Sequence, residues 1–133
     1  MDGGLILETT FLIDLEREAL RRSPDAAHRF LELHASSRLH ISLITSGELA
    51  AGPRLSGRSR WETLTGRFEV LLPDAEVAWR FGQTFRYLRD NGRLIGSNDM
   101  WIAATALAHG LPVVTRNVAH FRRVPDLEVL SYD

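Results

Sequence analysis

The sequence contains no cysteine and no lysine among its 133 residues. The lack of cysteine excludes disulfide frameworks, thiolate nucleophiles and cysteine-based zinc or iron–sulfur sites, and it suits a reducing compartment. The lack of lysine excludes mechanisms that depend on a catalytic or Schiff-base lysine. The formal net charge is −1. Binding of nucleic acid would therefore depend on a local basic patch rather than on the field of the whole protein.

Long apolar runs are also missing. No run reaches the ~18 residues that a membrane-spanning helix needs. The apolar stretch 5–15 is interrupted by Glu8 and Asp14 and has no basic flank, so it does not resemble a secretory signal. We expect one globular domain over residues 1–133, located in the cytoplasm and without membrane contact.

Short apolar runs that alternate with helical stretches predict an α/β fold. Four runs are typical of buried strands and a fifth is weaker; they cover residues 5–7, 41–44, 70–72, 112–115 and 127–130. They are continuous rather than alternating, as parallel strands covered on both faces should be. The predicted fold has three layers, with a central parallel sheet of four to five strands and helices on both faces.

Helix boundaries are indicated by capping residues. Ser23 and Asp74 precede two stretches with helical periodicity, and Ser97 precedes a third, which is apolar nearly all round and ends at Gly110. Such an apolar helix is expected to lie buried against the sheet. The segment 52–66 is less determined and is interpreted as a loop leading into a short helix.

Four polar residues fall where the predicted strands end. Glu8 closes the first strand, Glu48 follows the second by four residues, and Asn117 follows the fourth by two. Asp99 lies in the first turn of the buried helix. Ligands of open parallel sheets bind beyond the carboxyl ends of the strands, so these residues should meet at one edge.

Each of these residues has a structural explanation when taken alone. Glu8 can be a polar strand terminus, and Glu48 can form a capping box with Thr45. Asp99 is favourable at a helix N-terminus, and Asn117 is a common turn residue. Together, however, three neighbouring carboxylates would repel one another unless a cation neutralised them. Carboxylate and amide oxygens suit Mg²⁺ or Mn²⁺, so the sequence predicts a divalent-cation site.

Four segments resemble the motifs of one nuclease family. Residues 7–14 are similar to its first motif and residues 42–48 to its second. Residues 98–104 give the most specific match, and residues 114–117, followed by Phe121, resemble the fourth motif. The chain thus resembles the PIN-domain nucleases over almost its whole length, and within them the VapC toxins of bacterial toxin–antitoxin pairs.

The resemblance implies a PIN-like fold and a role for each residue of the predicted site. The catalytic residues would be Glu8, Glu48, Asp99 and Asn117, and the first three would bind the metal. Thr9, Thr115 and Ser97 would support these groups. Two departures stand out: Glu8 replaces the family's aspartate, and Thr10 replaces its asparagine. They imply reduced activity or an altered metal preference, because a longer carboxylate must be restrained more tightly.

The resemblance also implies an activity and partners. The expected protein is an Mg²⁺- or Mn²⁺-dependent endoribonuclease that hydrolyses RNA phosphodiester bonds. It would form a homodimer and be inhibited by a cognate antitoxin. Arg116, Arg54 and Arg58 are candidate contacts for RNA phosphates. Two alternatives remain: a catalytically impaired PIN domain that binds RNA or protein, and a PIN nuclease of RNA maturation.

Overall fold

One parallel five-stranded sheet organises the structure. The structure is a computed structural model that describes residues 3–55 and 57–133, except for the side chain of residue 54. Its strands lie in the order β3-β2-β1-β4-β5, and every neighbouring pair is parallel. Their bounds are β1 Leu5–Leu7, β2 Leu39–Ser42, β3 Glu69–Leu71, β4 Val113–Val114 and β5 Val129–Leu130. The predicted sheet is confirmed with all five of its strands.

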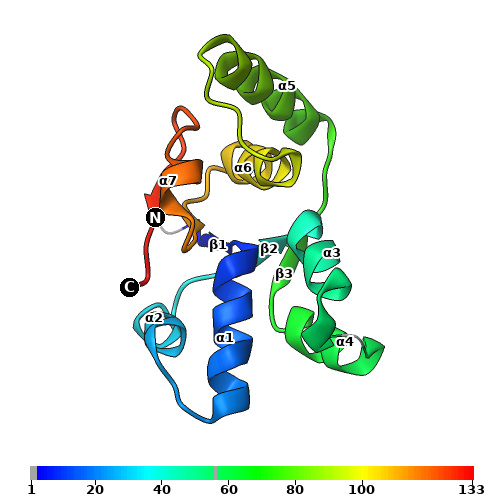
Figure 1. Cartoon of the computed structure of the whole chain (residues 1–133), viewed down its shortest axis with the longest axis vertical. Coiled ribbons are helices and arrows are strands. Elements are labelled where there is room, and N and C mark those ends of the chain that lie inside the picture. Colours follow the sequence, from blue (N-terminus) through cyan, green and yellow to red (C-terminus); the bar gives the residue numbers. More distant parts are fainter. Residues whose placement is uncertain (1–2, 56) are drawn as a thin grey trace.

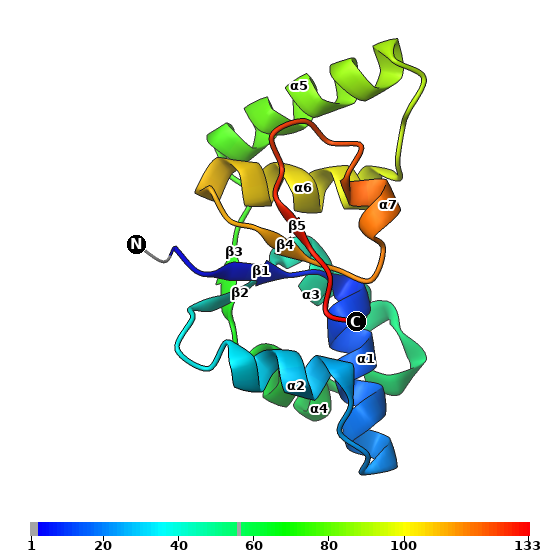
Figure 2. The same ribbon diagram turned by 90° about the vertical axis from the view of Figure 1, so that its left-hand side faces the viewer.

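Helices connect the strands and cover both faces of the sheet (Figures 1 and 2). Helices α1, α2 and α4 lie on one side in Figure 2, and α5, α6 and α7 lie on the other. The bounds are α1 Thr9–Arg21, α2 Ala26–Leu33, α3 Leu43–Ala51, α4 Arg58–Thr65, α5 Ala75–Asp90, α6 Ser97–His109 and α7 Val118–Phe121, with a 3-10 turn η1 at Pro53–Leu55. The three-layer prediction is therefore correct.

Two apolar cores result from the alternation of strand residues between the faces of the sheet. Leu5 and Leu7 pack into one core, whereas Ile6 between them packs into the other. The first core contains the apolar side of α1, and the second contains that of α6. The predicted burial of α6 is confirmed, since its residues 102–106 are all buried.

Several predicted helix starts are wrong. Ser42, at the end of β2, caps α3 by accepting the Thr45 amide, so residues 43–44 begin a helix rather than complete a strand. Helix α2 has Asp25 rather than Ser23 at its N-cap, and α6 has Gly96 rather than Ser97. The Asp74 cap and the left-handed Gly110 that ends α6 are confirmed. Segment 52–66 contains η1 and α4.

The strand order places a topological switch point between β1 and β4. After β1 the chain builds β2 and β3 on one side, and it then returns to add β4 on the other side of β1. The connections on the two sides cover opposite faces, which leaves a crevice at the carboxyl ends of β1 and β4. Glu8 follows β1 and Thr115 follows β4, so both lie at this crevice.

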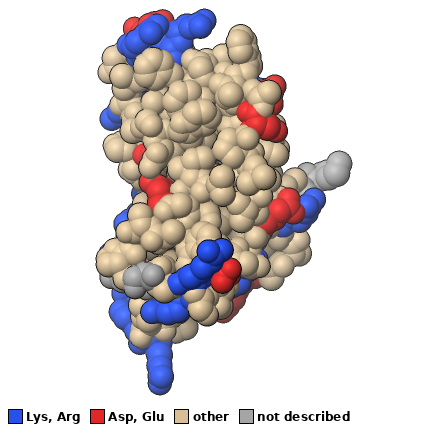
Figure 3. Space-filling view, turned by 90° about the vertical axis from the view of Figure 1, so that its right-hand side faces the viewer, with Lys and Arg blue, Asp and Glu red and all other residues tan. Residues whose placement is uncertain are grey.

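One face of the molecule carries few charges. On the side where α3, α4 and part of α5 are seen, charged side chains gather toward the two ends and the surface between them is mostly uncharged (Figure 3). Large apolar side chains are exposed at Leu43 in α3, at Leu72 directly after β3 and at Trp79 in α5. No helix within residues 3–55 and 57–133 combines the length and apolar character needed to cross a membrane.

Candidate active site

Glu8 occupies the centre of the crevice and is almost fully buried, with 3% of its surface exposed. It is the N-cap of α1, and its side chain accepts the Thr10 amide at 3.2 Å. The hydroxyls of Thr10 and Thr115 each donate to the same Glu8 oxygen, Oε1, at 2.6 Å. Burial raises the pKa of the Glu8 carboxyl; these hydrogen bonds oppose the rise, and the charge of Asp99 adds to it.

Asp99 approaches the crevice from the first turn of α6. Burial raises the pKa of its carboxyl, the negative charge of Glu48 adds to the rise, and His120 opposes it. The Nδ1 atom of His120 lies 3.8 Å from Asp99 Oδ2. Asp99 is therefore coupled to both predicted acidic partners, to Glu8 on one side and to Glu48 on the other.

Glu48 lies in the second turn of α3, and the capping-box interpretation of this residue is wrong because Ser42 caps the helix. Thr9 Oγ1 donates to Glu48 Oε1, and Asn98 Nδ2 donates to Oε2 at 3.3 Å. Both oxygens are thus held by neighbours from α1 and α6. Thr9 and Asn98 therefore both contact the carboxylate of Glu48, and the supporting role predicted for Thr9 stays a prediction.

Asn117 lies in the turn after β4 and contacts His120 rather than a carboxylate. Its side-chain nitrogen lies 2.8 Å from His120 Nδ1, and its backbone N–H donates to Thr115 Oγ1. Sequence reasoning missed His120. The signal was available, because Asn117 and His120 are three residues apart at the start of a short helix and so share one face.

Other predicted site residues have different surroundings. Ser97 is exposed and makes no side-chain hydrogen bond within the described part of the chain, so its predicted supporting role stays a prediction. Arg116 pairs with Asp14 at 2.8 Å, and Arg58 lies 3.5 Å from Glu62 on α4. The side chain of Arg54 lies outside the described residues, so its predicted role stays a prediction.

The carboxylates at the crevice are of the type that binds a divalent cation. Among residues 3–55 and 57–133, no three acidic or histidine side chains are close enough to form a preformed metal cage. Mg²⁺ does not require one, because it keeps several waters and is commonly held by one or two carboxylates. Glu8 and Asp99 provide such a pair: burial raises the pKa of both carboxyl groups, and a bound cation would favour their charged forms. The residues fit a hydrated Mg²⁺ or Mn²⁺ ion.

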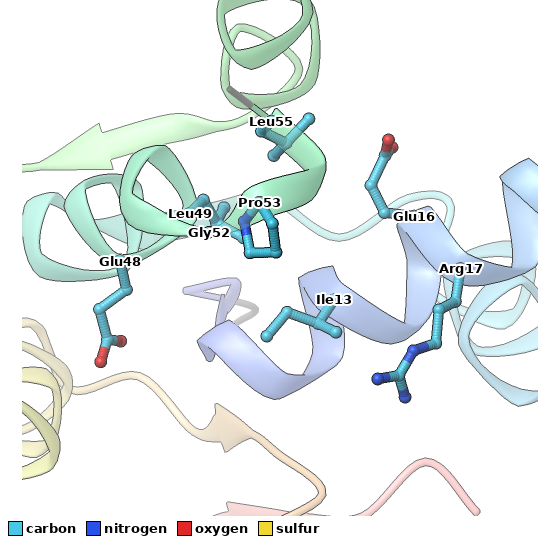
Figure 4. A pocket seen from close by; sticks show the side chains of 8 residues that line it. All are labelled: Ile13, Glu16, Arg17, Glu48, Leu49, Gly52, Pro53 and Leu55. Carbon is cyan, nitrogen blue, oxygen red and sulfur yellow. The ribbon is translucent and has the colours of Figure 1, made fainter. Parts of the chain in front are cut away.

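A cavity of about 400 Å³ opens beside this acidic site. Its walls come from α1, α3 and η1 and include Ile13, Leu49, Pro53 and Leu55. The apolar side chains occupy the middle of the cavity, with Glu48 at one end and Glu16 and Arg17 toward the other (Figure 4). An extended segment with apolar side chains and a terminal cation would match this arrangement.

Comparison with known proteins agrees with the fold. The model of the PIN domain family matches residues 5–127. The chain therefore belongs to the PIN domain family, in the branch of the VapC ribonucleases.

Individual relatives are similar over nearly their full lengths. Ribonuclease VapC1 of Haemophilus influenzae is 34% identical, with 92% of this chain and 93% of the relative covered. Ribonuclease VapC4 of Mycobacterium tuberculosis is also 34% identical, with 95% of each covered. Among solved structures, DNA-bound VapBC from Salmonella typhimurium matches with a TM-score of 0.85 and 30% identity over 100% of both chains. VapBC-1 from nontypeable Haemophilus influenzae matches with a TM-score of 0.80 and 32% identity over 96% and 97%.

Proposed function

We propose that this protein is a divalent-metal-dependent endoribonuclease and the toxin of a toxin–antitoxin pair. The observation that carries the proposal is the buried carboxylate of Glu8 at the switch point of the sheet, together with the half-buried carboxylate of Asp99, whose negative charge adds to the rise in the pKa of Glu8. Burying two like charges is costly unless a cation joins them. The relatives named as VapC ribonucleases support RNA as the substrate.

Glu8 and Asp99 would hold the Mg²⁺ or Mn²⁺ ion, with Glu48 within electrostatic reach of Asp99. When bound, the ion supplies an activated water and neutralises charge on the reacting phosphate. The residues of the chain itself position the ligands. Thr9 and Asn98 orient Glu48, while Asn117 holds the His120 ring beside Asp99.

The proposed partner is an antitoxin that occupies the cavity next to the acidic site. Solved complexes of similar chains carry the name VapBC, which supports a protein partner of this class. The apolar middle of the cavity would bind apolar side chains of the antitoxin, and Glu48 at its end would attract a basic one (Figure 4). Such binding would block access to Glu8 and Asp99.

The proposed homodimer would use the weakly charged face of Figure 3. Leu43 in α3, Leu72 directly after β3 and Trp79 in α5 are each at least 45% exposed. A patch of exposed apolar side chains is typical of an interface, and these three side chains would contribute to one. Sedimentation of the purified chain, compared with a Trp79→Ser variant, tests this part of the proposal.

The decisive experiment is cleavage of a structured RNA pool by the protein purified without an antitoxin. Reactions contain Mg²⁺, Mn²⁺ or a chelator, and the Asp99→Asn variant is compared with Asp90→Asn. Asp90 is an exposed acid at the end of α5 paired with Arg89, so its variant controls for loss of a charge elsewhere. We expect metal-dependent cleavage that Asp99→Asn abolishes and Asp90→Asn preserves. Metal-independent RNA binding without cleavage would instead favour an impaired binding module, and cleavage by Asp99→Asn would place the active site elsewhere.

A further inference from the structure

Two threonine hydroxyls from opposite sides of the switch point converge on one oxygen of Glu8. Thr10 lies in the first turn of α1, and Thr115 follows β4 and is fully buried. Both hydroxyls donate to Oε1, which also accepts the Thr10 amide. No described residue donates to the other oxygen, Oε2. The carboxylate therefore has one saturated oxygen and one that is left for a ligand.

Backbone groups fix the direction in which both hydroxyls donate. The Arg116 N–H donates to Thr10 Oγ1 at 3.0 Å, and the Asn117 N–H donates to Thr115 Oγ1 at 2.9 Å. A hydroxyl that accepts from a backbone N–H still has one proton to give. Glu8 Oε1 lies 2.6 Å from each hydroxyl oxygen, whereas the two hydroxyl oxygens are 3.4 Å from each other, so the carboxylate is the nearer acceptor for both. The turn after β4 thus orients both protons toward the carboxylate.

We propose that Thr10, acting with Thr115, is a positioning residue that clamps the long Glu8 side chain so that Oε2 alone faces the metal. This inference rests on the metal site of the proposed function. Glutamate has one more rotatable bond than aspartate, and three hydrogen bonds to a single oxygen remove that freedom. The threonine at position 10 and the glutamate at position 8 therefore form one coupled unit.

The length of the Glu8 side chain explains why Glu8 and Thr10 depend on each other. Thr115 follows β4 whereas Glu8 follows β1, and Thr115 is buried and fixed by its own backbone contacts, so it cannot follow a shorter side chain. The Glu8 carboxylate bridges from the end of β1 to both threonines. Removing the Thr10 hydroxyl would leave Oε1 with the Thr115 hydroxyl and the Thr10 amide, and the carboxylate would gain freedom to rotate.

The test measures Mn²⁺ binding by calorimetry to the full chain without RNA, together with cleavage. Thr10→Val removes the hydroxyl at nearly constant volume, Thr10→Ala does so without a branched side chain, and Thr10→Ser keeps it. Thr105→Val is the matched control, because Thr105 is a fully buried threonine whose hydroxyl donates to the Trp101 carbonyl. Circular dichroism and thermal melts of the metal-free proteins identify variants that fold.

We expect Thr10→Val and Thr10→Ala to weaken Mn²⁺ binding by about 10- to 100-fold, as loss of a residue that orients a ligand typically does. The Mn²⁺ concentration for half-maximal cleavage should rise while the KM for RNA stays constant. Thr10→Ser and Thr105→Val should bind Mn²⁺ like the parent. Parent-like Mn²⁺ binding by a folded Thr10→Val or Thr10→Ala variant overturns the clamp but leaves the proposed function standing. A parent protein that binds no Mn²⁺ overturns both proposals.

Discussion

Glu18 offers the sharpest test of how this fold is held together. It lies on α1 and is 5% exposed, yet it accepts hydrogen bonds from the first residues of α2. Its carboxylate receives the backbone N–H groups of Asp25, Ala27 and His28 at 2.8 to 3.1 Å and contacts the His28 ring at 2.7 Å. The N-cap of α2, Asp25, makes no side-chain cap of its own. Glu18 therefore caps α2 from another helix.

The size of the stabilisation by Glu18 follows from its pKa. Burial alone would raise this pKa, but the contact with His28 and the three backbone N–H groups outweigh it and lower the pKa from 4.5 to about 2. Folding thus favours the charged form, and the linkage contribution at neutral pH is on the order of 3 kcal/mol. Because the folded pKa is depressed, this stability is present above pH 4.5 and is lost as the pH falls toward 2.

Glu18→Gln should therefore lower the free energy of unfolding at pH 7 by about 2 to 3 kcal/mol, because an amide N–H₂ would face backbone donors. Urea denaturation followed by tryptophan fluorescence between pH 7 and pH 3 measures the effect. The gap between the two proteins should narrow below pH 4.5. Glu76→Gln is the control, since Glu76 forms an exposed pair with Arg80 and its loss should cost less than about 1 kcal/mol. A Glu18→Gln variant as stable as the control, or a gap that does not change with pH, would refute this reasoning.

Three further substitutions test the site and the sheet. Glu8→Gln should raise the stability of the metal-free protein at neutral pH. Burial raises the pKa of Glu8 in the folded state, so the charged carboxylate opposes folding above that raised pKa, and this cost is absent below pH 4.5. A less stable variant in urea denaturation with a chelator would contradict this. Glu8→Asp should weaken Mn²⁺ binding in calorimetry, because the shorter side chain loses the Thr115 hydroxyl; tighter binding would count against it. Gly4→Ala should cost more than about 1 kcal/mol in thermal denaturation, because φ is +96° and the added Cβ would lie 2.5 Å from the Arg38 carbonyl; an unchanged melting temperature would show that the backbone relaxes.

The sequence predicts the sheet well because burial on both faces leaves a strong pattern. Residues 5–7 form an apolar run between Gly4 and Glu8, and β1 has those bounds. The predicted ends of strands and helices are wrong where the same residues suit either a strand or a helix. Leu43 and Ile44 continue an apolar run, but Ser42 caps the Thr45 amide and turns them into a helix. An apolar run alone does not distinguish a buried strand from the start of a helix.

The candidate site was predictable to the extent that topology determines it. Glu8 follows β1 at the carboxyl edge of the parallel sheet, and Asp99 reaches the same edge because it lies in the first turn of α6, the helix that leads back to the start of β4. Their hydrogen-bond partners were less accessible from sequence. Thr10 and Thr115 meet only because β1 and β4 are neighbours in register, and the short helix α7 then directs His120 toward Asp99. Such contacts depend on differences in distance of a few tenths of an ångström, which the spacing of residues along the sequence does not encode.

The charge distribution explains why a cation is central to the proposed function. The arginine nearest the site, Arg116, is paired with Asp14, which also lies 3.6 Å from Arg17. Exposed pairs of this kind are weak, so an RNA phosphate can compete for the guanidinium group. Arg116, Arg17 and Asp14 together carry one net positive charge, which does not balance the two carboxyl groups of Glu8 and Asp99. With a net charge of −1 over the whole chain, attraction of a polyanion to this crevice requires that the acidic pair first be neutralised. The proposed ion would therefore recruit the RNA as well as promote its cleavage.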